Sequence, residues 1–109
     1  MPAKRDRLHG TLDALILKTL SWGPRHGYAI SRWLRETSGE AIQVEEGSLY
    51  PALYRLEKDG LITAEWGVTV LERRARFYDL TPAGRRQLAD EVAGFRRFVE
   101  AVSPILLAT

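Results

Sequence analysis

The hydrophobic period of the chain changes at Gly60, and this change sets the class of fold. Before Gly60, apolar residues recur every three or four positions, which is typical of amphipathic helices. After it, residues 61–68 alternate apolar and polar side chains, as a half-buried strand does. The chain then returns to a helical period after residue 81. We therefore expect a mainly α, α+β fold with one β-hairpin between helices.

Length and composition limit the remaining choices. At 109 residues the chain is one small domain, and help from a second subunit is expected because so small a core buries little apolar surface. With 45% apolar and 28% charged residues it is a globular chain rather than a disordered one. No apolar run is long enough to span a membrane, and residues 1–7 lead into no signal-peptide core. We expect a cytoplasmic protein.

The residue inventory argues against catalysis. There is no cysteine, and His9 and His26 are the two imidazoles, so disulfides, thiolate metal sites and cysteine nucleophiles are excluded. Neither histidine lies in a recognisable motif with a serine or a carboxylate, and no glycine-rich phosphate loop is present. We expect no metal, no cofactor and no enzymatic activity. His26 is interpreted as structural, capping the turn before Tyr28.

Two core helices are expected in the first 38 residues. In residues 10–20, apolar side chains repeat at helical spacing, and the glycine and proline of residues 22–27 end this helix. The second helix runs to residue 38 and is patterned by Tyr28, Ile30, Trp33 and Leu34. We expect Trp22 and Trp33 to be core residues.

Residues 45–60 predict a short helix with two unlike faces. Leu49, Leu53 and Leu56 form one apolar stripe, and Gly60 is a plausible stop. We expect Pro51 to lie in the first turn, where its missing N–H costs little. The opposite face is aromatic and basic and carries Gly47, Pro51, Tyr54, Arg55 and Lys58. Such a helix either reads DNA or simply covers its neighbours with its tyrosines and arginine.

A two-stranded hairpin follows, with strands at residues 61–68 and 74–80. Ile62, Ala64 and Trp66 alternate with polar residues on the first strand, and this predicts their burial. A lone hairpin is marginal in water, so it must pack on the helices. Three helices and this hairpin make a winged helix-turn-helix with a two-stranded wing.

The last helix opens with Thr81 as cap and Pro82 as first residue. A helix of about 22 residues spans roughly 33 Å, which exceeds the reach of so small a core. We expect it to end or kink near Ser103, because Pro104 follows. A coiled-coil-like seam runs along it through Leu88, Val92, Phe95, Val99, Val102 and Leu106. Part of that seam needs another subunit, unless the helix folds back on its own core. We accordingly divide the chain into a DNA-binding domain, 1–80, and a C-terminal dimerisation helix, 81–109.

These motifs in combination resemble the PadR family of bacterial transcriptional regulators. The resemblance rests on residues 10–13, 26–30, 47–57, 60–62, 64–67, 73–78 and 80–85, which together span residues 10–85. The single helix after the wing is similar to the short subfamily, and this implies a homodimer joined mainly through that helix and the first one.

The resemblance and the outward face together indicate which residues meet double-stranded DNA. A net charge of +2 is too modest to argue this, so the local arrangement carries the argument. Hydrogen-bonding side chains and a thymine-packing proline suit base edges in the major groove, and we place Ser48, Tyr50, Pro51 and Tyr54 there. Phosphate contacts are expected at Gly47, through its backbone, and at Arg55, Lys58, Arg73, Arg74 and Arg76. Arg5 and Arg7 are weaker candidates for an amino-terminal arm.

The expected function is sequence-specific transcriptional regulation. A two-fold dimer predicts an imperfect palindromic operator, and repression would follow from blocking polymerase. The resemblance also implies a small-molecule effector, an aromatic ligand at the dimer interface that relieves repression. Phe95 and Phe98 could line such a site, although aromatic residues at helical spacing more often serve packing.

One segment departs from the family pattern. Between the wing strands a polar turn is expected, but the chain has Thr69, Val70, Leu71 and Glu72. Either these apolar residues rest against a partner or the turn is shorter than it looks. They also support the main alternative, a winged-helix protein-interaction module without specific DNA binding. Affinity that falls steeply with salt would favour DNA.

Overall fold

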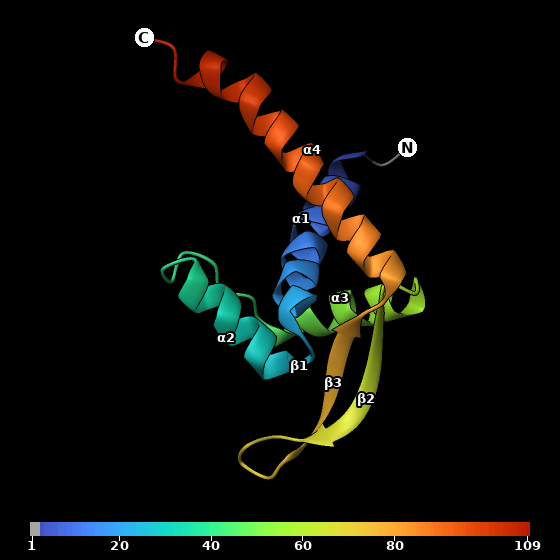
Figure 1. Ribbon diagram of the computed structural model, residues 1–109. Helices are drawn as coiled ribbons and strands as arrows, with labels where there is room; N and C mark the ends of the chain where they lie inside the picture. The colour runs from blue at the N-terminus through green and yellow to red at the C-terminus, as the bar shows by residue number, and fades with distance from the viewer. Residues whose placement is uncertain (1–2) are drawn as a thin grey trace.

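The computed structural model describes the backbone of residues 3–109 and the side chains of residues 11–109. Arg5 and Arg7, the candidates for an amino-terminal arm, lie outside the described side chains. The helices are α1 (Ala3–Thr19), the 3-10 turn η1 (Leu20–Trp22), α2 (Gly27–Thr37), α3 (Glu46–Lys58) and α4 (Pro82–Leu106). The strands are β1 (Arg25–His26), β2 (Ile62–Val68) and β3 (Arg74–Leu80). Figure 1 shows α1, α2 and α3 gathered above the hairpin, with α4 crossing α1 and leaving the core.

The core forms where the apolar stripes of α1, α2 and α3 meet the base of the hairpin. Its members share nearly complete burial: Ile16, Leu17, Leu20, Ile30, Leu34, Leu49, Ala52, Leu53, Leu56, Ile62, Tyr78 and Leu80. The predicted stripe of α3 is therefore confirmed, and a fourth residue, Ala52, belongs to it. These contacts hold α3 with its opposite face outward.

The position of Pro51 differs from the prediction. Because α3 begins at Glu46, Pro51 lies inside the helix rather than in its first turn. A proline there removes the hydrogen bond to the carbonyl four residues earlier, which belongs to Gly47. Gly47 is exposed, so water reaches that carbonyl. Exposure thus makes the interior proline tolerable.

The sheet has three antiparallel strands, in the order β1, β3, β2, not the two that the sequence predicts. Arg25 pairs with Tyr78 and His26 with Phe77, so the turn before α2 is fastened to the wing. His26 also caps α2, as predicted, because its Nδ1 accepts a hydrogen bond from the amide of Ala29 at 3.3 Å. This histidine joins the first half of the chain to the hairpin.

Several aromatic residues expected in the core are exposed. Trp22 is 61% exposed, and its ring lies 5.3 Å from that of Trp33, which is half-buried against the core. Tyr28 and Trp66 are also exposed. The helices cover only the base of the hairpin, so Ile62 is buried and Trp66 is not. Tyr28 lies in the first turn of α2, beyond the core contacts that bury Ile30.

The last helix begins as predicted and ends later. Thr81 Oγ1 accepts a hydrogen bond from the amide of Gly84 at 3.0 Å. The helix continues past Ser103 and through Pro104 to Leu106, so of the two alternatives expected near Ser103, an end or a kink, the end is wrong. Pro104 lies in the exposed last turn, where a lost hydrogen bond is replaced by water. None of the helices in the described part of the chain is long and apolar enough to cross a membrane.

Candidate nucleic-acid interface

The outward face of α3 carries the side chains that the sequence singles out. Gly47, Ser48, Tyr50, Pro51, Tyr54 and Lys58 are exposed, as is Glu46 at the start of the helix. Their positions follow from the burial of Leu49, Leu53 and Leu56 on the opposite side of the helix. This face is rich in hydroxyl groups and is open to solvent.

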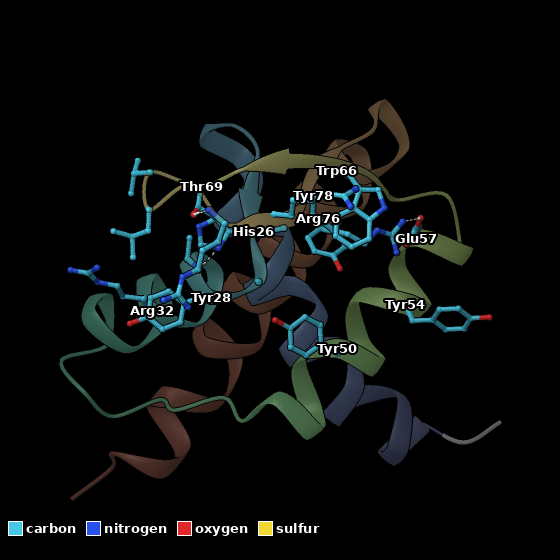
Figure 2. A pocket seen from close by; sticks show the side chains of 17 residues that line it. His26, Tyr28, Arg32, Tyr50, Tyr54, Glu57, Trp66, Thr69, Arg76 and Tyr78 are labelled. Atoms are coloured by element: carbon cyan, nitrogen blue, oxygen red, sulfur yellow. Dashed lines mark hydrogen bonds and ion pairs between the residues drawn. The ribbon is translucent and has the colours of Figure 1, made fainter.

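An open cleft of about 950 Å³ lies beside this face, between α2, α3 and the wing. Figure 2 shows Tyr28 and Arg32 of α2, Tyr50 of α3 and Trp66 of β2 around it. Three residues of the cleft, Tyr28, Arg32 and Trp66, were missed as site residues. For Tyr28 and Trp66 the reason is that a periodic aromatic residue is assigned to the core by default. The cleft combines aromatic and basic side chains from three elements.

The three wing arginines differ in their surroundings. Arg73 is exposed in the turn, and the guanidinium carbon of Arg74 lies 4.8 Å from the ring centroid of Trp66. Arg76 Nη2 instead lies 3.0 Å from Glu57 Oε2 of α3, an ion pair that ties the wing to the helix. Arg73 and Arg74 are thus presented outward, while Arg76 already has an acidic partner.

Arg55 also has an intramolecular partner. Its Nη2 lies 3.0 Å from Asp13 Oδ1 of α1, in a half-buried position. Lys58, one turn later on the same helix, is exposed. Of the two basic residues of α3, Arg55 is therefore paired with a carboxylate of α1 and Lys58 is exposed to solvent.

Two groups in the cleft keep one charge state around neutral pH. Burial raises the pKa of Tyr78, and nearby Arg76 opposes this shift without cancelling it. The hydrogen bond and charge of Glu36 raise the pKa of Arg32 further above its ordinary value. Tyr78 stays neutral and Arg32 stays cationic, so their charges do not change near neutrality.

Close packing sets the position of Tyr50. A methyl group at Gly27 would lie 2.7 Å from the hydroxyl oxygen of Tyr50, closer than carbon and oxygen atoms approach. The absence of a side chain at the start of α2 thus leaves room for the tyrosine ring.

Among the described residues, no group of three or more histidines or carboxylates could hold a metal ion.

The comparisons with known proteins agree with this geometry. The model of the transcriptional regulator PadR-like family matches residues 16–90, which is more than half of the chain. The chain belongs to this family. PadR-family proteins are transcriptional regulators, and the resemblance seen in the sequence is therefore confirmed.

Solved structures and sequence relatives support the assignment to the PadR family. A PadR-like transcription factor from Bacteroides fragilis has a TM-score of 0.78 at 30% identity, with 96% of this chain and 99% of that chain covered. Transcriptional regulator Rv3488 of Mycobacterium tuberculosis is 47% identical over 60 residues, 54% of this chain and 55% of that protein. Bacillus subtilis PadR in complex with operator DNA has a TM-score of 0.66 at 28% identity, covering 74% of this chain and 46% of that chain. The two solved structures share the winged-helix architecture described above.

The seam residues of α4 divide into two groups in this PadR-family chain. Leu88 packs against the core of its own chain, and Val92 and Val102 are half-buried. Phe95, Val99 and Leu106 are exposed, as is Phe98. The outer half of α4 thus presents apolar side chains to its surroundings.

Proposed function

We propose that the protein is a homodimeric, sequence-specific DNA-binding repressor. The observation that carries this proposal is the common orientation of α3 and the wing: Tyr50 and Tyr54 line the same cleft as Arg73 and Arg74. A helix fits the major groove, where base edges are readable, and basic side chains beside it can hold the phosphates. One duplex could contact both elements.

The proposed contacts follow from exposure and chemistry. Ser48, Tyr50 and Tyr54 offer hydroxyl groups to base edges, and Pro51 offers an apolar surface to a thymine methyl. The backbone at Gly47, near the positive end of the helix dipole, suits a phosphate. Lys58, Arg73 and Arg74 supply further phosphate contacts. We give Arg55 and Arg76 a structural role, because each is paired with a carboxylate.

The proposed dimer rests on the apolar surface of α4. Phe95, Val99 and Leu106 are 67%, 39% and 75% exposed, and a second α4 would bury them. Residues 1–80 would then bind DNA and residues 81–109 would join the subunits. A two-fold axis presents two α3 helices, so the operator is an imperfect palindrome with half-sites about one helical turn apart.

The relatives support the regulatory role. The negative transcriptional regulator PadR of Bacillus subtilis is 29% identical over 79 residues, 72% of this chain and 43% of that protein. By analogy, we propose that this protein represses by occupying a promoter. A small aromatic ligand would relieve repression by binding beside Phe95 and Phe98, in a site that the partner helix completes.

The test is fluorescence anisotropy with DNA from upstream of the protein's own gene and a shuffled duplex, over a salt series. Preferential, salt-sensitive binding to the upstream DNA supports the proposal, because neutralising phosphates releases counterions. Lys58→Gln should lower the salt slope by about one, whereas Arg97→Gln, an equal change on exposed α4, should not. Weak, equal affinity for both duplexes, insensitive to salt, would favour a protein-interaction module instead.

A further inference from the structure

The tip of the wing exposes two neighbouring apolar side chains. Val70 is 98% exposed and Leu71 is 74% exposed. Single exposed apolar residues are common, but two at the end of a projecting hairpin find no packing within the chain. A contact with another molecule would remove them from water.

The turn that carries these residues is held by local hydrogen bonds. The amide of Thr69 donates to the carbonyl of Arg73 at 2.9 Å, and the amide of Glu72 donates to the carbonyl of Thr69 at 2.8 Å. The amide of Arg73 donates to Thr69 Oγ1 at 3.2 Å. Glu72 adopts the left-handed conformation, with φ of 60°, that reverses the chain. The tip is therefore preformed, and little ordering is required when it makes a contact.

The wing tip faces the same side of the molecule as α3. Val70 and Leu71 line the cleft together with Tyr50 and Tyr54 of α3. Figure 1 shows the wing tip at the opposite end of the molecule from the C-terminus of α4, so this helix of the same chain does not cover it. A molecule that fills this cleft therefore contacts both α3 and the tip.

Charge distinguishes between the partners that could lie there. Arg73 and Arg74 follow the tip directly, against the single carboxylate of Glu72 in the turn, whereas the cleft's other two arginines, Arg32 and Arg76, are paired with Glu36 and Glu57. Two apolar side chains beside arginines match the minor groove of a duplex, whose walls are sugars and phosphates and where apolar side chains can insert between stacked base pairs. The side chains around the tip are predominantly basic. They therefore favour DNA, which is negatively charged, over a second copy of this chain, whose surface is equally basic there.

We propose that Val70 and Leu71 form an apolar wedge that enters the minor groove next to the site read by α3. This inference rests on the proposed function and extends it. Arg73 and Arg74 hold the flanking phosphates while the two side chains press against a base step, partly unstack it and bend the duplex away from the wing. Pyrimidine–purine steps unstack most easily, so the wedge adds sequence preference at a position without polar contacts.

The test compares wild-type protein with the double variant Val70→Ser/Leu71→Ser on the upstream duplex. Energy transfer between dyes at the two ends of the duplex reports bending, and anisotropy over a salt series reports affinity. We expect about tenfold weaker binding from the loss of apolar contact. The salt slope should stay at the wild-type value, because no phosphate contact is removed. The bend, about 20–90° for wedges of this kind, should be reduced.

Two controls make the outcome specific. Leu107→Ser is the same change at a leucine of similar exposure, 77%, beyond the last seam residue; light scattering should find its dimer intact, and it should then alter neither bend nor affinity. Arg73→Gln removes a proposed phosphate contact, so unlike the serine variant it should lower the salt slope, by about one. Wild-type affinity and bend in the serine variant would overturn the wedge while leaving the DNA-binding function intact. Failure of the wild-type protein to bind any duplex would overturn both proposals.

Discussion

The guanidinium of Arg55 lies 3.0 Å from the carboxylate of Asp13, so α3 and α1 are joined by an ion pair at the edge of the core. Both side chains are partly exposed, and such a pair contributes about 0.2–1 kcal/mol to the free energy of unfolding. The pair also turns the Arg55 charge toward α1, away from Lys58.

Arg55→Gln should therefore lower the free energy of unfolding by no more than about 1 kcal/mol and leave the salt slope of DNA binding unchanged. Lys58→Gln, the same change one turn later, should lower the slope by about one and leave stability unchanged. Urea unfolding and anisotropy measure the two effects. If Arg55→Gln reduced the salt slope, Arg55 would contact a phosphate after all.

Gly27→Ala should act through Tyr50. The added methyl group would lie 2.7 Å from the tyrosine hydroxyl, and the ring is a flexible side chain that can move aside. We expect weaker operator binding with a nearly unchanged melting temperature. In the Tyr50→Ala background the same change should cause no further loss, because the displaced group is gone. Additive losses in this double-mutant cycle would show that Gly27 acts independently of Tyr50.

Trp66→Leu should weaken DNA binding by releasing Arg74. The ring holds the guanidinium at 4.8 Å from its centroid, a contact that contributes about 0.5–1 kcal/mol at exposed sites, or about two- to fivefold in affinity. The effect should disappear in the Arg74→Gln background. If Trp66→Leu weakens binding equally in both backgrounds, the indole itself contacts the DNA.

Two glycines of α4 should respond in opposite ways to alanine. At Gly84 a Cβ atom would overlap the carbonyl oxygen of Leu61, a backbone atom that also accepts a hydrogen bond from the amide of Thr81. Gly84→Ala should therefore destabilise the fold by about 1–3 kcal/mol. At Gly94 the nearest atom would be an Arg97 nitrogen at 3.8 Å, so Gly94→Ala should stabilise by up to about 1 kcal/mol. Urea unfolding at one fixed protein concentration compares them.

Val99→Glu should separate the proposed dimer, because burying an unpaired carboxylate between two helices is costly. Ala101→Glu introduces the same charge on the same helix at an exposed position outside the seam and should leave the dimer intact. Light scattering on eluting protein measures the mass of each variant. A dimer that survives Val99→Glu would place the subunit contact elsewhere.

Local features of the chain could be predicted from the sequence. The stripe of Leu49, Leu53 and Leu56, the bounds of β3 and the caps at His26 and Thr81 all appear as predicted. Each depends on residues a few positions apart, because helical period, strand alternation and capping bonds act over one or two turns. For the same reason the outward residues of α3 were identifiable as candidates.

What the sequence by itself determined, then, is the order of the four helices and the hairpin, the family and the outward face of α3. Only the tertiary structure decided the partners of Arg55 and Arg76, the exposure of Trp22 and Trp66, and the pairing of β1 with β3. Arg55 and Asp13 are 42 positions apart, and no local pattern links such residues. Periodicity shows that a face is apolar, but whether that face is covered depends on how far neighbouring elements reach. In this protein the helices reach the base of the wing and leave its tip exposed.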